Sequence, residues 1–434
     1  MKIYVHIPFC EHKCKYCSFA SSVCSERTQT AYFFALTNEI TRAASLLKKE
    51  KITSIYIGGG TPSVVDKHHI TNLVQLLESN FEIAKDAEIT IEANPNTASP
   101  EKLAAYKLAG VNRISFGAQS FDNSLLKTLG RTHSKNQIFK AVEDARKAGF
   151  ENISIDLILG VKKFENLDEN IKQLARTGLT HISAYMLILE DNTPLKIEVN
   201  TGKTKVLTDD ESVEEYEHAY KVFKANGFER YETSNFAKAG FESRHNMGYW
   251  QMEEYIGFGL AAHSYLDGKR FSNTENLNEY LNIFGNENKI EKNKKVNKIN
   301  KKIIKNTKKI DFFNKKREKN INFDYFLIKP LKNQAQKIAS KKFDFRGKTV
   351  FDFSKTFEQL SPAQTFEEYI MLGLRTAKGI DLNRLKRLGF DLKKERAKEI
   401  EPLLSAGALT LENDFLKLTP AFYGVQNQII LKLI

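Results

Sequence analysis

The stretch Cys10-Glu11-His12-Lys13-Cys14-Lys15-Tyr16-Cys17 decides how the rest of the chain is interpreted. It has the spacing C-x3-C-x2-C and directly follows a short run of strand-forming residues, Lys2–Ile7. The chain has four cysteines in 434 residues, and all of them lie within the first 24. Cysteines confined to one end cannot cross-link a chain of this length. We therefore exclude a secreted disulfide framework and expect thiols kept for metal or redox chemistry in a reducing compartment.

Three closely spaced cysteines are compatible with two kinds of metal site. A structural zinc site needs a fourth ligand, which His6 or His12 could supply. An electron-carrying iron–sulfur cluster takes a Cys on each iron, whereas three thiolates leave one iron of a four-iron cluster open for another ligand. Cys24 has a poor spacing for a fourth ligand, and we expect it to be a small buried apolar residue. We favour the four-iron site and keep zinc as the alternative.

Strand-like and helix-like segments alternate after the cysteine stretch. The helix-like segments include Thr30–Glu50, Ser134–Phe150 and Asp210–Phe228. The further strand-like segments, rich in Ile, Val and Tyr, are Ile52–Ile57, Glu88–Ala93, Arg113–Gly117, Asn152–Leu159 and His181–Leu189. The alternation predicts an α/β fold of parallel strands joined by right-handed crossovers. Six units are fewer than the eight of a closed (β/α)₈ barrel, so periodicity leaves both a partial barrel and a doubly wound sheet open.

Residues 284–360 interrupt this pattern with a low-complexity segment and its flank. Residues 286–320 contain thirteen Lys and one Arg against four acidic residues, and so carry +10 of the net charge of +13. The rest of the chain is nearly balanced, which excludes a basic nucleic-acid-binding face across the whole fold. The composition of the segment predicts flexible coil or a solvated helix. We expect no nucleic-acid partner, and an RNA-binding arm is the weakest of the alternatives.

Residues 361–434 return to an ordered pattern. Helix-like segments at Thr365–Arg375, Leu382–Leu388 and Lys393–Ala406 precede a hairpin-like stretch, Leu409–Leu418, which together predict a winged-helix-like domain. No segment reaches about 18 uninterrupted apolar residues, so we expect no transmembrane helix. The first residues do not resemble a signal peptide. We expect a cytoplasmic protein, with peripheral membrane association and oligomeric state left open.

The cysteine loop, with the aromatic Tyr16 before its third Cys, resembles that of the radical S-adenosylmethionine superfamily. The second strand ends in Gly58-Gly59-Gly60-Thr61-Pro62, which is similar to the glycine motif of that superfamily. The resemblance implies a partial (β/α)₆ barrel over residues 1–283. It also implies a [4Fe–4S] cluster on Cys10, Cys14 and Cys17, whose open iron is chelated by the methionine moiety of S-adenosylmethionine.

Several polar residues near the ends of the strands match the cofactor contacts of the coproporphyrinogen-dehydrogenase branch of the superfamily. By that resemblance Glu92 and Arg131 hold polar groups of the cofactor, and Asp156 holds a hydroxyl or charged end. Tyr4 packs near the sulfonium. Taken singly, each residue could equally form a salt bridge or a helix cap. The full set implied for S-adenosylmethionine is Tyr4, Tyr16, Gly59, Gly60, Thr61, Glu92, Gln119, Arg131 and Asp156.

Two features separate the members of this branch. The dehydrogenases carry a further Cys two residues after the third, where this chain has Phe19. The segment His245-Asn246-Met247-Gly248-Tyr249-Trp250 is similar to the H-N-x-x-Y-W signature of the HemW-type haem chaperones. The resemblance covers Met1 to about Asn276 and resumes at about Gln364.

The resemblance implies a chaperone that passes haem to an acceptor protein, with a respiratory-chain protein as one candidate. The alternative is an enzyme of porphyrin biosynthesis that oxidatively decarboxylates coproporphyrinogen III. We assign no catalytic residue from the sequence, and we judge this enzymatic activity the weaker reading because the fourth Cys is absent.

A haem site needs an axial ligand, flat apolar walls and partners for the propionates. His245 is the candidate ligand, Tyr249 and Trp250 are the candidate walls, and Arg244 is a candidate propionate partner. The alternative is that His245 and Asn246 hydrogen-bond a turn while Trp250, the only tryptophan, fills the core. The other candidate haem ligands are His263, Met186 and Met252.

Overall fold

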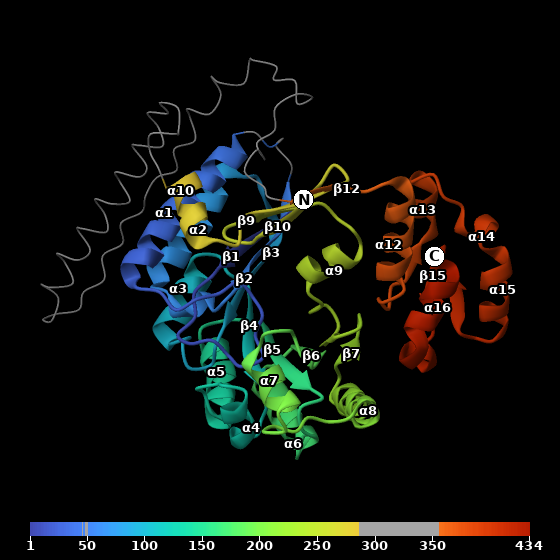
Figure 1. Cartoon of the computed structure of the whole chain (residues 1–434), viewed down its shortest axis with the longest axis horizontal. Helices are drawn as coiled ribbons and strands as arrows, with labels where there is room; N and C mark the ends of the chain where they lie inside the picture. Colours follow the sequence, from blue (N-terminus) through green and yellow to red (C-terminus); the bar gives the residue numbers. More distant parts are fainter. Residues whose placement is uncertain (46, 48–50, 286–355) are drawn as a thin grey trace, which may run out of the picture.

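The structure is a computed structural model that describes residues 1–45, 47, 51–285 and 356–434. The Lys- and Asn-rich stretch 286–320, and the predictions made for it, lie outside these residues. Figure 1 shows a barrel-like body with a smaller C-terminal part beside it, drawn in orange and red. Within the described ranges, no helix combines the length and the apolar character needed to cross a membrane.

Six consecutive parallel strands form the centre of the body, as the sequence predicts. Neighbouring strands pair in chain order from β1 to β6, and all of these pairs are parallel. The strands are β1 (Lys2–Ile7), β2 (Ile52–Gly59), β3 (Ile83–Ala93), β4 (Arg113–Gln119), β5 (Asn152–Leu159) and β6 (His181–Met186). Six further strands extend the described sheet at both edges, so it stays open at β12 and β7 and does not close on itself. The partial barrel is therefore confirmed.

The additional strands come from the second half of the chain. β9 runs parallel to β1, and the remaining pairs are antiparallel. The strands are β7 (Glu229–Arg230), β8 (Asn235–Ala237), β9 (Tyr255–Phe258), β10 (His263–Leu266), β11 (Lys269–Ser272) and β12 (Thr356–Gln359). Because β12 pairs with β11, the last residues of the segment predicted as 284–360 belong to the sheet of the body.

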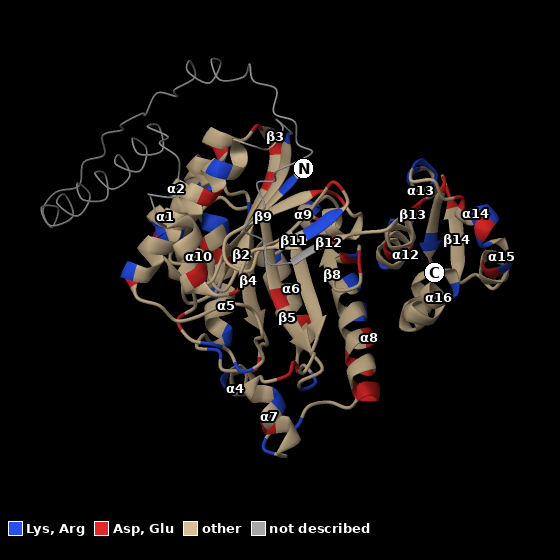
Figure 2. Ribbon diagram, turned by 45° about the horizontal axis from the view of Figure 1, so that its top comes forward, with Lys and Arg blue, Asp and Glu red and all other residues tan. Residues whose placement is uncertain are grey.

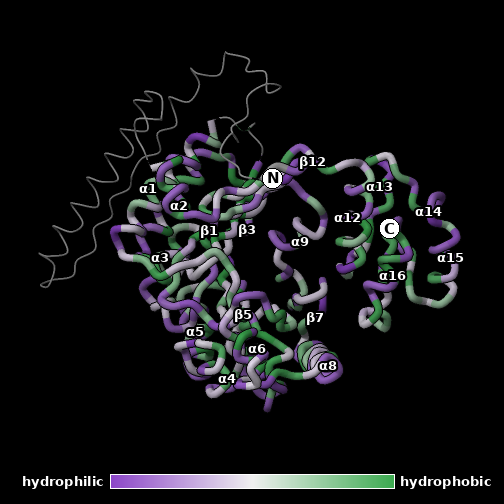
Figure 3. Tube along the Cα trace, in the orientation of Figure 1, coloured by the Kyte–Doolittle hydropathy of each residue, from purple (hydrophilic) through white to green (hydrophobic). Residues whose placement is uncertain are grey.

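Helices cover the outer face of the strands. Alternate residues of a strand point to opposite faces, and the apolar residues on the outer face are buried by the helices. In β2 the outward Ile55 and Ile57 are fully buried in the main core, whereas Ser54, Tyr56 and Gly58 face the interior of the barrel. Figure 3 shows hydrophobic stretches recurring along the strands and helices. The helices are α1 (Glu26–Ala44), α2 (Lys67–Asn80), α3 (Pro100–Leu108), α4 (Asn123–Thr128), α5 (Lys135–Lys147), α6 (Leu167–Thr177), α7 (Pro194–Asn200), α8 (Asp209–Ala225), α9 (Arg244–Trp250) and α10 (Leu277–Phe284).

Local signals explain where the predicted helices begin. α1 starts at Glu26, four residues before the expected Thr30, because the Ser25 side chain accepts a hydrogen bond from Thr28 N. α5 begins after Ser134, which forms a capping box with Gln137, as its sequence suggests. The ends of α5 and α8 are followed by Gly149 and Gly227, both with positive φ.

The C-terminal part has its own core and a three-stranded antiparallel sheet. Its element order, helix–strand–helices–hairpin, is that of a winged helix, and the predicted hairpin is present. The strands are β13 (Ile380–Asp381), β14 (Leu409–Glu412) and β15 (Phe415–Leu418). The helices are α12 (Pro362–Gly373), α13 (Leu382–Arg387), α14 (Leu392–Glu395), α15 (Ala397–Ser405) and α16 (Gln426–Leu433). The single helix expected at Lys393–Ala406 is thus two helices, separated at Arg396, whose φ of −124° is not helical.

Polar contacts attach the C-terminal part to the body next to α9. Arg384 donates to the carbonyl oxygens of Gln251 and Met252, just after α9, at 2.5 and 3.1 Å. Arg270 on β11 makes a two-pronged ion pair with Glu368 on α12. Figure 2 shows acidic and basic residues interspersed along the helices of both parts.

Candidate functional site

The cysteine loop lies at the carboxyl end of β1, where parallel α/β folds bind ligands. Cys10, Cys14 and Cys17 are all half-buried free thiols. Backbone hydrogen bonds fold the loop back on itself, from Cys10 N to Ser22 O at 3.1 Å and from Cys17 N to Cys14 O at 3.2 Å. The three thiols therefore lie on one compact loop.

The donor set fits a multi-iron cluster better than a single ion. Among the described residues, no three His, Cys, Asp or Glu side chains converge closely enough to hold one metal ion. Cluster thiolates each bind a different iron and need not converge on one point. Both ring nitrogens of His6 are hydrogen bonded, to Tyr4 and Ala20, and His12 Nε2 bonds to Gly130 O. In this conformation His6 therefore has both of its ring nitrogens occupied.

Cys24 lies in a different environment from the other three cysteines. Its side chain is partly buried, packs against the main core and lies 3.2 Å from Ser22 Oγ. This is close to the apolar role expected for it, although the side chain is not fully buried. Phe19, at the position of the fourth Cys of the dehydrogenases, is 66% exposed.

Arg131 ties the cysteine loop to the ends of two strands. Its guanidinium donates to Cys14 Sγ at 3.4 Å and hydrogen-bonds Tyr16. The same group donates to Asn94 Oδ1, just after β3, and to Gly117 O on β4, both at 2.6 Å. Asn94 in turn donates to Thr61 Oγ1, which lies 3.7 Å from Cys10 Sγ. The structure thus brings Arg131, Tyr16 and Thr61 together beside the cysteines, and their role in binding the cofactor stays a prediction.

The glycine run follows β2 against the cysteine loop. Gly60 N donates to Ile7 O at 2.9 Å, and a Cβ on Gly60 would lie only 2.7 Å from Phe9 O. Gly59 has a φ of +113°, which side chains rarely adopt. The run needs glycine because the backbone here lies directly beside the cysteine loop, which is the close approach expected of a cofactor cradle.

Glu92 on β3 points into the barrel, and its carboxylate is buried there. Tyr56 Oη donates to Oε1 at 2.7 Å, and Gly59 N donates to Oε2 at 3.0 Å. Burial raises the pKa of Glu92 to about 7, against the lowering effect of the Tyr56 hydrogen bond. The carboxyl is therefore an oriented acceptor near the glycine run.

The remaining predicted cofactor residues lie on neighbouring strands. Asp156 on β5 accepts from Ser115 Oγ at 3.0 Å, and burial raises its pKa. Gln119 ends β4 at a bulge with a φ of +65°, a strained backbone of the kind found at functional sites. Tyr4 on β1 stacks against Tyr56 at 6.3 Å between ring centroids. Gln119 lies beside Arg131, because a Cβ on Gly117 would meet Gln119 Nε2 at 2.9 Å and the Arg131 guanidinium at 3.0 Å. Tyr4 and Asp156 instead lie near Glu92, inside the barrel.

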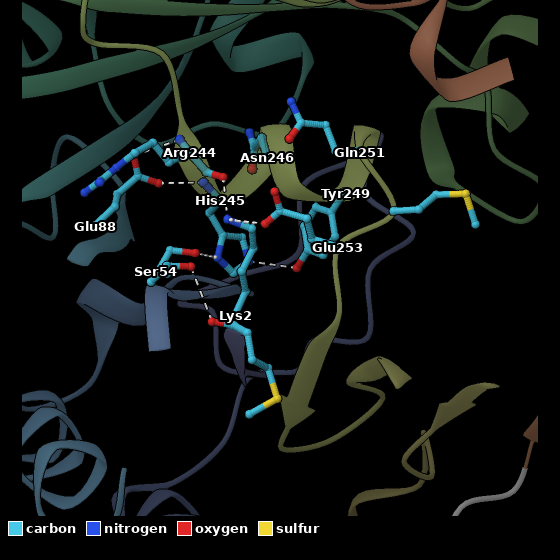
Figure 4. Close-up of polar contacts among 12 residues, drawn as sticks. Lys2, Ser54, Glu88, Arg244, His245, Asn246, Tyr249, Gln251 and Glu253 are labelled. Atoms are coloured by element: carbon cyan, nitrogen blue, oxygen red, sulfur yellow. Dashed lines mark hydrogen bonds and ion pairs between the residues drawn. The ribbon is translucent and has the colours of Figure 1, made fainter. Parts of the chain in front are cut away.

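The histidine signature lies on α9, which contacts Lys2 of β1, Ser54 of β2 and Glu88 of β3 (Figure 4). His245 is fully buried, with Nδ1 2.9 Å from Ser54 Oγ and Nε2 2.9 Å from Tyr249 Oη. Burial lowers the pKa of His245 well below its usual value, so the imidazole is neutral. Both ring nitrogens have partners, as in the hydrogen-bonding alternative, but these partners are side chains of β2 and α9 and not a turn. Haem ligation by His245 stays a prediction.

The other candidate haem residues lie in different places. Arg244 forms an ion pair with Asp86 at 3.1 Å, and Trp250 is half-buried without belonging to a core cluster. Met252 is buried in the core of the C-terminal part, which removes it from a haem surface. Met186, at the end of β6, is 36% exposed, and His263 is also exposed.

Two residues of the site were not predicted from the sequence. Asn94 links Thr61 to Arg131, and its position two residues after Glu92 was the available signal. Tyr56 bonds Glu92 and lies against His245, with 5.2 Å between ring centroids. Its even spacing from Gly58 on the same face of β2 was the only indication in the sequence.

Comparison with known families agrees with this geometry. The sequence profile of the Radical SAM superfamily matches residues 4–176, and that of the HemN C-terminal domain matches residues 360–421. The haem chaperone HemW of Lactococcus lactis is 38% identical over 289 residues, which cover 66% of this chain and 75% of that protein. HemW of Bacillus subtilis is 37% identical over 283 residues, which cover 64% and 75%.

A solved structure shares this fold. It is the coproporphyrinogen III oxidase HemN of Escherichia coli, described as a radical SAM enzyme, with a TM-score of 0.71 and 19% identity. The superposition covers 100% of this chain and 89% of that one, and at this identity it shows the fold alone. With its cysteine loop, glycine run and parallel partial barrel, the chain belongs to the radical S-adenosylmethionine superfamily as a HemW-like protein with a HemN-type C-terminal domain.

Proposed function

We propose that this protein is a haem chaperone, which binds haem and passes it to an acceptor protein. The observation that carries the proposal is its similarity to proteins named haem chaperones, at 34–38% identity over about 65% of the chain. The signature His245-Asn246-Met247-Gly248-Tyr249-Trp250 on α9 supports it. The acceptor is a protein, with a respiratory-chain component as one candidate, and the cellular site of transfer is the cytoplasm or its membrane surface.

The cysteine loop is proposed to hold a [4Fe–4S] cluster on Cys10, Cys14 and Cys17. When bound, the cluster would supply an iron that chelates S-adenosylmethionine and an electron to it. Around it, Arg131 positions the Cys14 thiol, and Gly59 and Gly60 let their backbone lie close to His6 and Phe9, just before the cysteine loop. Glu92 and Asp156 offer carboxylate oxygens to the polar groups of the nucleoside.

Haem binding by α9 requires a conformation other than the one described. His245 has to give up its hydrogen bonds with Ser54 or Tyr249 to reach an iron atom. Contacts from other elements hold α9 in its present place: Glu88 accepts from its first two backbone N–H groups, Lys2 donates to Arg244 O, and Arg384 holds the backbone just after the helix. Movement of this short helix is therefore part of the proposal.

A haem titration tests the proposal with a matched pair of histidine variants. His245→Ala should weaken haem binding about tenfold or more, or shift the Soret band, because one axial ligand contributes strongly to affinity. His218→Ala, which removes an exposed imidazole on α8, should bind as the wild type does. If both variants bind haem with the wild-type affinity and spectrum, His245 is not the ligand. If the wild type shows no haem binding, the chaperone proposal fails.

The alternative function is oxidative decarboxylation of coproporphyrinogen III. The fold similarity to HemN is the observation in its favour. Against it stands Phe19, an exposed aromatic side chain where the dehydrogenases carry their further Cys. The chaperone is therefore the proposal we prefer.

A further inference from the structure

The carboxylate of Glu92 is oriented by neighbours whose role is otherwise unassigned. Inside the barrel it accepts one hydrogen bond from Tyr56 Oη on Oε1, at 2.7 Å, and one from Gly59 N on Oε2, at 3.0 Å. Two donors on different oxygens fix the orientation of the carboxylate plane, whose last torsion is otherwise broad. Only one of these donors is a side chain.

Tyr56 is itself held by packing along one face of β2. Its ring lies 5.2 Å from the His245 ring and 6.3 Å from the Tyr4 ring, measured between centroids. Ser54, two residues earlier on the same face, bonds His245 Nδ1. Gly58, two residues later, makes room for the pair, because a Cβ there would lie 2.8 Å from Glu92 Oε2 and 2.9 Å from Tyr56 Cε1. Small residues on either side thus leave the space that the phenol and the carboxylate occupy.

We propose that Tyr56 is a positioning residue for S-adenosylmethionine, acting through its hydrogen bond to Glu92. The inference rests on the proposed placement of the cofactor against Glu92. The phenol occupies one lone pair of Oε1 and Gly59 N occupies one of Oε2, so the remaining lone pair of each oxygen is left for the polar groups of the ligand. The phenol also supplies a donor that stabilises the ionised carboxylate in a buried setting, where an unpaired charge is costly.

The pH dependence of binding provides a signature that a merely structural residue would not give. An ionised Glu92 accepts from the cofactor, so affinity rises as the pH passes upward through the pKa of Glu92, which is about 7 in the free protein. Removing the phenol donor raises that pKa further, so the rise in affinity moves to higher pH. The titratable or charged groups that act on Glu92 from the surrounding elements are Tyr4, Tyr56, Arg113, Asp156, Tyr185 and Tyr249.

The test is calorimetric titration of the reconstituted, cluster-loaded protein with S-adenosylmethionine between pH 6 and 9. Tyr56→Phe keeps the ring beside His245 and removes only the hydroxyl. It should bind about tenfold more weakly at pH 7, and the loss should shrink toward pH 9. Tyr106→Phe on α3 is the control, because it removes a buried phenol hydroxyl that has no hydrogen-bond partner in the structure. Iron and sulfide content, together with the unfolding midpoint, show that each variant is folded and loaded.

The Glu92→Gln variant tests the placement of the cofactor at Glu92 separately from the positioning role of Tyr56. If Glu92→Gln weakens binding and Tyr56→Phe binds as the wild type does at every pH, the positioning role of Tyr56 is wrong while the placement at Glu92 stands. If Glu92→Gln also binds as the wild type does, the placement at Glu92 is wrong and the inference falls with it. A loss in Tyr56→Phe that is the same at every pH would likewise overturn it. The titration measures binding of S-adenosylmethionine and not of haem. Its result can therefore be interpreted even if the chaperone proposal fails.

Discussion

Arg131 shows how one side chain makes the cysteine loop part of the barrel. Its planar guanidinium reaches Cys14, Asn94 and Gly117, which belong to three different chain segments. Lysine has a single ammonium on a flexible stem and cannot make these contacts together. Arg131 is therefore the residue that couples the loop to β3 and β4.

The cysteines give the first prediction at this scale. Replacing Cys10, Cys14 or Cys17 with Ala should abolish the reconstituted cluster, because three thiolates are already the smallest set that can hold it. Cys24→Ala should assemble the cluster as the wild type does, since its thiol packs against the core. Iron and sulfide analysis with the visible absorption spectrum measures both. Loss of iron in Cys24→Ala equal to that in Cys14→Ala would show that the open-iron assignment is wrong.

At the scale of elements, α9 depends on a carboxylate from outside its own segment. Glu88 on β3 accepts from Ser243 Oγ and from the backbone N–H groups of Arg244 and His245 (Figure 4). These N–H groups have no partner within the helix. Because α9 has only seven residues, most of its stability comes from such tertiary contacts.

We predict that Glu88→Gln loosens α9 specifically. The substitution places an amide donor against a backbone donor, so we expect a loss of about 1–3 kcal/mol in local stability. Hydrogen exchange of residues 244–250 should become faster, while that of α5 stays as in the wild type. Glu143→Gln, which changes an exposed i,i+4 ion pair on α5, is the control. Unchanged exchange in α9 would show that Glu88 does not hold this helix.

A second prediction for an element concerns Glu39 on α1 and the dependence of stability on pH. Its buried carboxylate accepts from Gly259 N, Asn273 Nδ2 and Tyr280 Oη, and burial raises its pKa to about 7. Between about pH 4.5 and 7 the folded state keeps a proton that the unfolded state releases, so this group lowers stability as pH rises. The stability of the wild type relative to Glu39→Gln should therefore fall by up to about 3 kcal/mol from pH 4.5 to 7.

The quantity to compare is the difference in the free energy of unfolding between the wild type and Glu39→Gln. Buried histidines change stability with pH in the opposite direction, but they do so equally in both proteins. Urea unfolding of wild type and Glu39→Gln at several pH values gives this difference directly. A difference that stays constant over this range would contradict the raised pKa of Glu39.

The sequence predicts elements well where local signals agree with the fold. β1 and β5 match their predicted bounds because alternating apolar residues and flanking turns define both ends. Glu92 and Asp156, predicted to hold the cofactor, lie on the strands where the sequence pattern expects them, and their role stays a prediction. The position of α9 was not predictable, since its contacts with Lys2, Ser54 and Glu88 join segments about 155 to 245 residues apart. The same is true of the Tyr56–His245 contact.

At the scale of the whole molecule, the predicted site residues form two groups. The residues predicted to hold the cofactor lie beside the cysteine loop and inside the barrel, and the histidine signature lies on α9. Tyr56 contacts both, through Glu92 on one side and His245 on the other. The C-terminal part adds Arg384, which holds the backbone just after α9. Both the barrel and the C-terminal part therefore control the position of α9.

Deletion of residues 286–320 tests whether the basic segment belongs to this arrangement. Its net charge of +10 is most of the +13 of the chain, so the deletion should lower nonspecific retention on nucleic acid. Cluster content and haem binding should remain those of the full chain. A deletion protein that does not fold would contradict the passive role predicted from the composition of the segment.

The central claim is that this HemW-like protein carries haem and does not decarboxylate porphyrinogens. The most direct measurement is anaerobic incubation of the cluster-loaded protein with coproporphyrinogen III, S-adenosylmethionine and reductant, in parallel with a haem titration of the same preparation. The account predicts a Soret band that saturates with haem and no consumption of coproporphyrinogen III. Stoichiometric turnover of coproporphyrinogen III with loss of two carboxyl groups would contradict the account and establish the enzyme instead.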